Sequence, residues 1–398
     1  MKKITILGDI MNEPVMLEQA RMADGSYDYY PAFAPLQKLL DEADYRIANL
    51  ETPLAGEEAL YTQNIFQFNT PDSIMDALKK LGFEALSFAN NHTFDRGQAG
   101  MLRTVKVLKE NGFAVTGAYE DPTSDRIAYF TVGDTKIAWI AYTYGTNEKP
   151  ESAEAEAQVN YLRRIGAPWM RPPFSDQFLK VRELVTGWLG RGFSMVERVE
   201  LCKLLGEAVA YGDECFDALD SAEALKKLQK DYEEARKNAD LVLFYPHVGG
   251  QFNVKPGSFS KFIAAEAVKM GFDAVLEAHS HTTQIAKIID GKPVFYSLGN
   301  VSMTHTVYTV DESLPEYGLA AHLYVDGGKI VKTAFSIFKM WEREGHCMEI
   351  WPTDELAAKL EGREKDALLK DVAAVWARVS GKNEDDFVPA REYELPMK

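Results

Sequence analysis

Polar side chains that can bind a metal ion or move a proton occur in five short clusters along the chain. They are Asp9; Asn49 and Glu51; Asn90, Asn91, His92 and Asp95; His247; and His279 and His281. Carboxylate and amide oxygens combined with imidazole nitrogens suit Mn, Fe or Zn better than Ca or Mg. The set is large enough for two ions if one carboxylate bridges them, and we assign Glu51 as the bridge. Two divalent transition ions about 3.5–4 Å apart can activate a water molecule by lowering its pKa toward about 7.

Acid–base chemistry is predicted for His92, which directly follows Asn91. If Asn91 binds an ion through its amide oxygen, the imidazole of His92 is free to donate a proton to a leaving group. Simpler interpretations exist for the same residues. His92 could form only a structural hydrogen bond, and one residue of the Asn90 and Asn91 pair could adopt the left-handed turn conformation that asparagine tolerates. Asp9 could cap the next helix, and Glu51 could cap a loop.

Each of these clusters lies at or just past the end of a segment that is predicted to be a short buried strand. Nearly continuous apolar runs predict strands at Lys3–Leu7, Tyr45–Leu50, Ala85–Ala89, Ala114–Gly117, Ile137–Tyr144, Leu241–Tyr245, Ala274–Glu277 and Val294–Ser297. Stretches with helical periodicity lie between several of them, including Pro71–Leu81, Ala99–Asn111 and Phe259–Met270. This alternation indicates an α/β protein. Because ligands of such sheets bind beyond the carboxyl ends of the strands, we expect the clusters to meet at one edge.

The α/β pattern is interrupted after Pro150 by a stretch rich in Glu, Lys, Arg, Ala and Leu. We interpret residues 151–234 as a helical insertion into a core made of residues 1–150 and 235–350, followed by a mostly helical tail at 351–398. Helical spacing within the insertion is seen at Ser221–Asn238. The insertion forms either a small core of its own or a lid over the metals, and the residues of interest are Trp169, Met170, Arg171, Trp188, Arg191 and Arg198. Beyond it, Ala320–Val325 and Lys329–Phe338 flank a Gly327-Gly328 turn and predict a hairpin.

Composition narrows the class of protein. Of the 398 residues 46% are hydrophobic and 26% are charged, which excludes disordered, collagen-like and coiled-coil chains. The net charge of −16 disfavours nucleic acid and anionic membranes as partners, although an anionic small-molecule, peptide or polymer substrate fits if a metal supplies local positive charge. Three cysteines form no disulfide framework and no zinc motif. The sequence has no signal-peptide pattern and no apolar run of about 18 residues, so we expect a cytoplasmic protein without a membrane span.

Several short motifs, taken in order, resemble a known family. They are Gly8-Asp9-Ile10-Met11, Asn49-Leu50-Glu51, Ala89-Asn90-Asn91-His92 with Asp95 and Gly97, the stretch from Ala141 to Asn147, His247-Val248-Gly249, Ala278-His279-Ser280-His281, and Tyr296-Ser297-Leu298-Gly299-Asn300. These motifs resemble those of the bacterial CapA-type capsule synthesis proteins. That family is linked to poly-γ-glutamate production and belongs to the calcineurin-like metallophosphoesterase superfamily.

The resemblance implies a four-layer αββα sandwich with a metal site at one edge. It implies that the metal ligands are Asp9, Glu51, Asn91, His247, His279 and His281. It also implies that His92 is the proton-donating histidine and that Asp95 orients either His92 or the loop. One departure concerns the ions directly: many superfamily members carry a histidine where this chain has Met11, so one ion has a ligand fewer. Another is Val248, where the family usually has tryptophan.

Three remaining histidines and the cysteines receive simpler interpretations. His305 is expected to be a solvated loop residue, and His322 to serve packing or lie on the surface. His346 and its neighbour Cys347 have no assigned role, and Cys202 and Cys215 are treated with Cys347 as small hydrophobic residues.

Three functions are compatible with the sequence. The first is a metal-dependent hydrolase that directs metal-activated water at a phosphoester or a glutamyl or peptide-type substrate, in line with the resemblance to capsule biosynthesis proteins. The second keeps the metals but uses them for proton abstraction or epimerisation of a peptide. The third is a non-catalytic accessory subunit of a polymer synthase.

Overall fold

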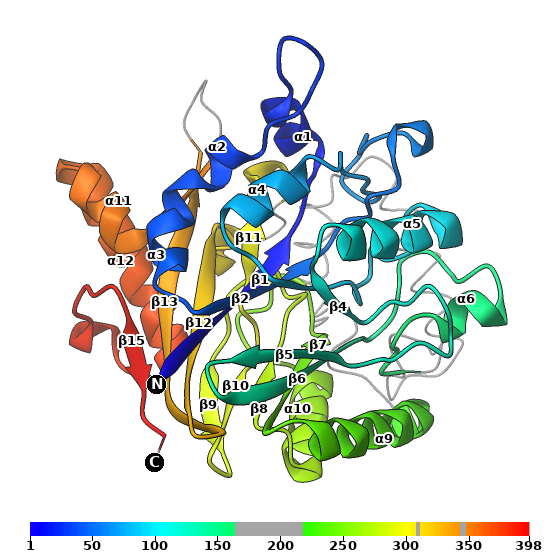
Figure 1. The fold of residues 1–398 in the computed structure, drawn as a ribbon. Helices are drawn as coiled ribbons and strands as arrows, with labels where there is room; N and C mark the ends of the chain where they lie inside the picture. Colours follow the sequence, from blue (N-terminus) through cyan, green and yellow to red (C-terminus); the bar gives the residue numbers. More distant parts are fainter. Residues whose placement is uncertain (164–217, 308–310, 343–347, 398) are drawn as a thin grey trace, which may run out of the picture.

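A computed structural model describes residues 1–163, 218–307, 311–342 and 348–397. It shows two sheets packed face to face, with helices on the outer side of each (Figure 1). The predicted four-layer αββα sandwich is confirmed. The cysteines, His346 and the six named residues of the insertion lie outside the described residues.

The first sheet contains the amino-terminal strands and a carboxyl-terminal hairpin. Its main order is β14-β13-β12-β1-β2-β3-β4, with β11 paired to β1 and β15 paired to β13. The strands are β1 (Lys2–Ile10), β2 (Tyr45–Leu50), β3 (Ala85–Ser87), β4 (Ala114–Thr116), β11 (Asn300–Ser302), β12 (Tyr317–Asp326), β13 (Lys329–Trp341), β14 (Glu349–Pro352) and β15 (Tyr393–Leu395). Strands β1 to β4 run parallel, so their carboxyl ends lie at one edge.

The second sheet has the order β5-β6-β7-β8-β10-β9. Its strands are β5 (Ala128–Val132), β6 (Thr135–Thr143), β7 (Leu241–His247), β8 (Ala274–Leu276), β9 (Ala286–Ile289) and β10 (Lys292–Phe295). The four central strands β6, β7, β8 and β10 are parallel, as expected for nearly continuous apolar runs that are covered on both faces.

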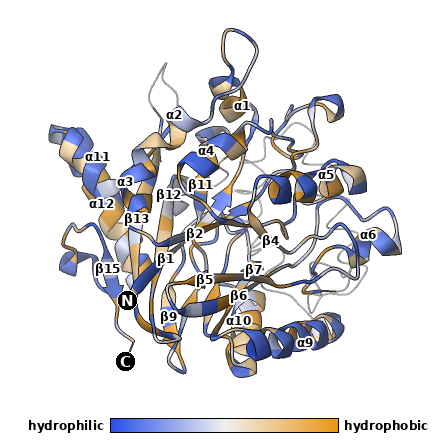
Figure 2. Ribbon diagram, viewed as in Figure 1, coloured by the Kyte–Doolittle hydropathy of each residue, from blue (hydrophilic) through white to orange (hydrophobic). Residues whose placement is uncertain are grey.

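Helices bury their apolar sides on the outer faces of the sheets. The first sheet is covered by α1 (Pro14–Ala20), α2 (Tyr30–Phe33), α3 (Gln37–Asp41), α4 (Ile74–Lys80) and α5 (Gly97–Glu110). The second is covered by α9 (Ala222–Asn238) and α10 (Ser258–Met270). The short α6 (Ala153–Ala157) follows β6. Figure 2 shows that the outward side of α9 is hydrophilic, which agrees with the helical spacing of its sequence.

The strands of the sandwich alternate between two apolar cores. In β6, Trp139 belongs to the core between the sheets, whereas the next residue, Ile140, belongs to the core under α9 and α10. Likewise Ile6 of β1 faces the second sheet and Leu7 faces the outer helices. This alternation follows from the twofold periodicity of a strand. Because residues within the strands point into one of the two cores, the residues at the strand ends are left to line the edge of the sandwich.

Two carboxyl-terminal helices close the side of the inter-sheet core. They are α11 (Thr353–Lys359) and α12 (Gly362–Ser380), and buried side chains of α12 such as Val375 and Trp376 join that core. Among the described residues, none of the helices combines the length and the apolarity that a bilayer crossing requires.

Candidate metal centre

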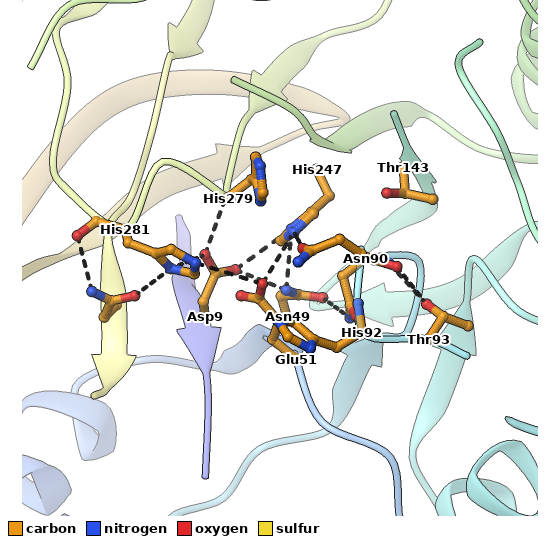
Figure 3. A network of polar contacts seen from close by, with 12 residues as sticks. Asp9, Asn49, Glu51, Asn90, His92, Thr93, Thr143, His247, His279 and His281 are labelled. Carbon is orange, nitrogen blue, oxygen red and sulfur yellow. Dashed lines mark hydrogen bonds and ion pairs between the residues drawn. The ribbon is translucent and has the colours of Figure 1, made fainter. Parts of the chain in front are cut away.

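The predicted ligands meet at one edge of the sandwich, although they come from both sheets (Figure 3). Asp9 is near the end of β1, Glu51 directly follows β2, and His247 is the last residue of β7. Asn91 follows β3, and His279 and His281 follow β8. All six residues are buried, with exposures of 2% or less. The parallel strands therefore place these residues together because their carboxyl ends share an edge.

The carboxylate and imidazole groups form two sets of closely spaced ligand atoms. One set contains Glu51, His247 and His279, and the other contains Asp9, Glu51 and His281; within each set the atoms lie within 4.8 Å of one another. Glu51 belongs to both sets. Its Oε1 lies 3.3 Å from His247 Nε2 and 3.9 Å from His281 Nε2. This is the arrangement expected of a bridging carboxylate.

Asn91 lies beside the first set of ligand atoms. Neither Asn91 nor its neighbour Asn90 has a left-handed backbone. The Oδ1 atom of Asn91 is 2.7 Å from His247 Nε2, so an amide oxygen lies close to the ligand atoms. Asn90 instead supports the turn. Its Nδ2 donates to Leu50 O at 2.7 Å, and its Oδ1 accepts from the backbone N–H of His92 at 3.1 Å.

The candidate ligand atoms fit a metal ion because several of them have no hydrogen-bond partner. Both carboxylate oxygens of Glu51 and the Nδ1 atom of His279 are buried and make no hydrogen bond. Glu51 therefore does not cap a loop. Asp9 does not cap α1 either, since that helix begins at Pro14 and its N-cap residue is Glu13. Buried acceptors without donors are costly, and a bound cation would compensate them.

The electrostatics of the site also favour a cation. Burial raises the pKa of Asp9 to about 8, and the neighbouring Glu51 charge adds to this shift. Burial likewise raises the pKa of Glu51 to about 8. It lowers the pKa of His247 to about 4 and that of His281 to about 3, so the imidazoles are neutral and available as ligands. A divalent cation would reverse the unfavourable burial of the two carboxylates.

Two asparagines orient the candidate ligands Asp9 and His281. Asn49 Nδ2 donates to Asp9 Oδ1 at 2.7 Å. Asn300 contacts His281 twice: its Oδ1 lies 2.9 Å from Nδ1, and its Nδ2 donates to the backbone carbonyl at 2.9 Å. The Nδ1 contact leaves Nε2 of His281 directed toward Glu51. Neither asparagine was expected to orient a ligand, although both lie in the motifs quoted above.

His92 and Asp95 form a buried pair beside the ligands. His92 Nδ1 is 2.7 Å from Asp95 Oδ2, which also accepts from the backbone N–H of Phe68 at 2.6 Å. The Phe68 ring lies 4.3 Å from the His92 ring, centroid to centroid. Burial lowers the pKa of His92, but the charge and hydrogen bond of Asp95 and the charge of Glu51 outweigh it, so the net pKa is raised. A protonated His92 suits a general acid.

Other residues singled out in the sequence lie in different surroundings. Met11 is buried and its backbone pairs with Ser302, but it belongs to neither set of ligand atoms. His322 is buried between Thr5 and Ser336, which confirms its packing role. His305 is exposed, as expected, and lies 2.6 Å from a carboxylate oxygen of Glu342. The ring of Tyr144 lies 4.6 Å from that of His279, a contact that the sequence did not indicate.

Comparison with known proteins places these observations in context. The capsule biosynthesis protein CapA of Bacillus anthracis is 24% identical over 321 residues, covering 79% of this chain and 63% of that protein. The PGA biosynthesis protein CapA of Bacillus subtilis is 21% identical over 322 residues, covering 79% of this chain and 67% of that protein. Among solved structures, TT1561 of Thermus thermophilus aligns with a TM-score of 0.38 and 12% identity, covering 85% of this chain and 98% of that chain.

The chain spans between three fifths and two thirds of the length of the curated relatives that it matches. Its residues 3–304, which include every candidate ligand, match the family described as bacterial capsule synthesis protein PGA_cap. This chain therefore belongs to the PGA_cap family of bacterial capsule synthesis proteins.

Proposed function

We propose that this chain is a metal-dependent hydrolase that acts on an anionic phosphoester or on a glutamyl or peptide-type bond in capsule metabolism. The observation that carries the proposal is the pair of buried ligand sets that share Glu51. A scaffold has no need for a buried carboxylate whose two oxygens both lack hydrogen-bond partners.

Two divalent transition ions, Mn, Fe or Zn, would supply Lewis-acid chemistry by polarising the scissile group and acidifying a water molecule. Glu51 would hold both ions. His247, His279 and Asn91 would hold one of them, and Asp9 and His281 would hold the other.

Proton transfer would fall to His92. Asp95 occupies its Nδ1 side at 2.7 Å, which leaves Nε2 to hold a proton for the leaving group. Asp95 itself would act by fixing the ring and stabilising its charged form. This pair serves a phosphoester and an amide equally well, because both leaving groups need a proton.

The charge of the loaded site indicates an anionic substrate. Asp9 and Glu51 are the carboxylates of the two ligand sets, so two divalent ions would leave the centre with excess positive charge. A phosphoester or the free carboxylate of a glutamyl residue would balance it. The negative charge of the whole chain, −16, makes this local reversal important for substrate capture.

Metal analysis of the purified chain tests the proposal first, followed by turnover of bis(p-nitrophenyl) phosphate and γ-glutamyl p-nitroanilide with Mn, Fe or Zn. Two ions per chain and turnover of one substrate are expected. Asp9→Ala and His279→Ala are expected to lower both the metal content and the turnover. The matched control is Glu13→Gln, which alters a fully buried carboxylate outside the ligand sets and should change neither.

Three results would contradict the proposal. A chain that binds no ion after reconstitution is not a metal enzyme. Turnover that survives both ligand substitutions would rule out a mechanism that depends on these ions. Metal binding without hydrolysis, accompanied by exchange of solvent deuterium into a recovered peptide, would indicate proton abstraction instead.

A further inference from the structure

The loop that carries two of the candidate ligands has an unusual backbone. His279 has φ of 97° and His281 has φ of 52°, both in the left-handed region that side chains other than glycine rarely adopt. Such a conformation is strained and persists only where the surroundings enforce it. Contacts that hold this loop are therefore part of how the site is built.

Two of the residues that hold this loop, Asp9 and Asn300, lie within residues 3–304, which match the family. Asp9 Oδ2 accepts a hydrogen bond from the backbone N–H of His279 at 3.0 Å. Asn300 holds the ring and the backbone carbonyl of His281. Asn300 Nδ2 also donates to Pro315 O at 3.1 Å, which connects His281 to the segment just before β12.

A third contact comes from α12, far along the chain. Arg378 Nη1 donates to Ser313 O at 2.6 Å and to Thr282 Oγ1 at 3.0 Å. The Thr282 hydroxyl in turn donates to Ser313 O at 2.7 Å, so the three residues form a closed triangle. Weaker contacts at 3.4 Å reach the carbonyl and the hydroxyl of Thr283. Thr282 and Thr283 are fully buried and directly follow His281.

The helix that provides Arg378 is itself fixed to the sandwich. Its buried side chains, including Val375 and Val379, join the core between the sheets. Asp371, two turns earlier, accepts a hydrogen bond from Tyr317 of β12 at 3.0 Å. Arg378 therefore reaches the loop from a rigid support, and α12 lies outside residues 3–304 that match the family.

Burial of the charged guanidinium group of Arg378 costs free energy, which its hydrogen bonds must offset. Burial lowers the pKa of Arg378 to about 10, and the charges of Glu316 and Glu384 partly offset this shift. The side chain nevertheless remains charged at neutral pH. Charged donors make the stronger hydrogen bonds to carbonyl and hydroxyl oxygens, which suits a group that restrains a strained loop.

We infer that Arg378 is a positioning residue for the metal ligand His281, through its hydrogen bonds to Thr282 and Ser313. This inference rests on the proposed metal function. Arg378 touches neither of the two sets of ligand atoms, so its effect must pass through the backbone that follows His281. It should therefore influence the ion held by Asp9, Glu51 and His281 more than the ion held by His247 and His279.

The test is a titration of the full chain with Co²⁺ in the absence of substrate. Binding is monitored by calorimetry and by visible absorption, whose bands report the geometry of the ligands. Arg378→Met removes the donors at similar length and should weaken one of two sites about tenfold, within the range for residues that orient metal ligands, while altering the spectrum of that site alone. Arg378→Lys should recover part of the affinity, because an ammonium group can still donate to Ser313 O. Arg363→Met, at an exposed position in the first turn of the same helix, is the control and should match the wild type.

Each outcome decides the matter. Wild-type affinity and spectrum in Arg378→Met would overturn the inference and leave the metal function standing. Equal weakening of both sites together with a lower melting temperature would overturn it too, since that result describes general destabilisation. A wild-type chain that binds no Co²⁺ would refute the metal function and the inference with it. If Arg378→Met does not fold, Thr282→Val removes the middle hydroxyl of the triangle and must weaken the same site for the inference to hold.

Discussion

Replacing the shared carboxylate, Glu51→Gln, should have opposite effects on stability with and without metal. The substitution keeps the shape of the side chain but removes its negative charge. In the ion-free protein Glu51 is fully buried, and neither of its oxygens has a hydrogen-bond partner. Loss of the charge should therefore increase the stability of the ion-free protein. In the loaded protein the same change removes a ligand from both sets and should hinder metal binding.

The size of the first effect follows from the pKa of Glu51, which burial raises from 4.5 to about 8. A carboxyl group whose folded pKa is raised binds more protons in the folded state, so stability falls as pH rises between the two values. The penalty is absent below 4.5 and complete above about 8. At pH 7 it amounts to about 3 kcal/mol, taking 1.36 kcal/mol per unit, and this is an upper value because water can enter an ion-free site.

The second effect is the loss of stabilisation by bound metal, and its size is set by mass action. Ions at about 100 times their dissociation constant stabilise the folded state by about 2.7 kcal/mol for each site. Loss of the bridging charge should remove most of that contribution from both sites at once, which no other single substitution in the two sets would do.

Urea unfolding at pH 7 measures both effects. In EDTA, Glu51→Gln should be more stable than the wild type by up to about 3 kcal/mol, and this gain should vanish near pH 4. With excess Mn²⁺ the order should reverse. Glu13→Gln is again the control, because it also neutralises a fully buried carboxylate but should leave the stabilisation by metal unchanged. Glu51→Gln that is less stable in EDTA, or that keeps the full stabilisation by Mn²⁺, would refute the reasoning.

Further predictions concern the acid, the separate ions and the fold. His92→Asn should lower kcat about 10²–10⁴-fold on a substrate whose leaving group must be protonated, without changing metal content, and steady-state assays beside elemental analysis would show this. Asp95→Asn should move the basic limb of the kcat profile to lower pH, because the Asp95 charge raises the pKa of His92. His279→Ala and His281→Ala should each reduce the occupancy of one ion only, as counted by elemental analysis; loss of both in either variant would contradict two separate sets. Burial raises the pKa of Glu392, but hydrogen bonds from two lysines and a tyrosine outweigh it and hold the pKa at about 2. The stability that Glu392 provides is full above pH 4.5 and lost toward pH 2. Because Glu392 is only half-buried, solvent screening reduces the effect, so Glu392→Gln should lower the free energy of unfolding by about 1–2 kcal/mol at pH 7, and an unchanged urea midpoint would contradict this.

The buried parallel strands could be predicted because their sequences are almost uniformly apolar. The strand expected at Tyr45–Leu50 has the same bounds as β2, and the strand expected at Leu241–Tyr245 is β7 with two more residues. The hairpin of β12 and β13 around Gly327 and Gly328 is confirmed as well. These segments carry their signal locally, since both faces of each strand are covered.

Several edge strands could not be predicted from the sequence. β5 has a mixed burial pattern, and it is a strand because Ala128–Val132 pairs antiparallel with β6 across a tight turn. β9 depends in the same way on its pairing with β10. For such short segments the partner strand, and not the local pattern, decides the structure.

That the candidate ligands meet at one edge could be predicted for a different reason, which is the repetition of polar residues at strand ends. What the sequence could not show is which contacts hold these residues. Asn300 contacts His281 from 19 positions away in the chain, and Arg378 contacts the adjacent Thr282 from 96 positions away, across contacts that only the tertiary structure creates. Positive φ at His279 and His281 was equally hidden, because only a small fraction of histidines adopts that conformation.

The two ligand sets are unequal, and the inequality has a functional consequence. The set with His247 and His279 has Asn91 close by. The set with Asp9 and His281 gains no ligand from position 11, where many superfamily members carry a histidine, because Met11 belongs to neither set. A thioether is too soft to replace imidazole beside carboxylate oxygens. An ion held by Asp9, Glu51 and His281 would therefore keep open positions, and open positions are where catalytic metal ions accept water or a substrate oxygen. With so few protein ligands, the placement of His281 matters most at this ion, which is where the restraint from α12 is applied.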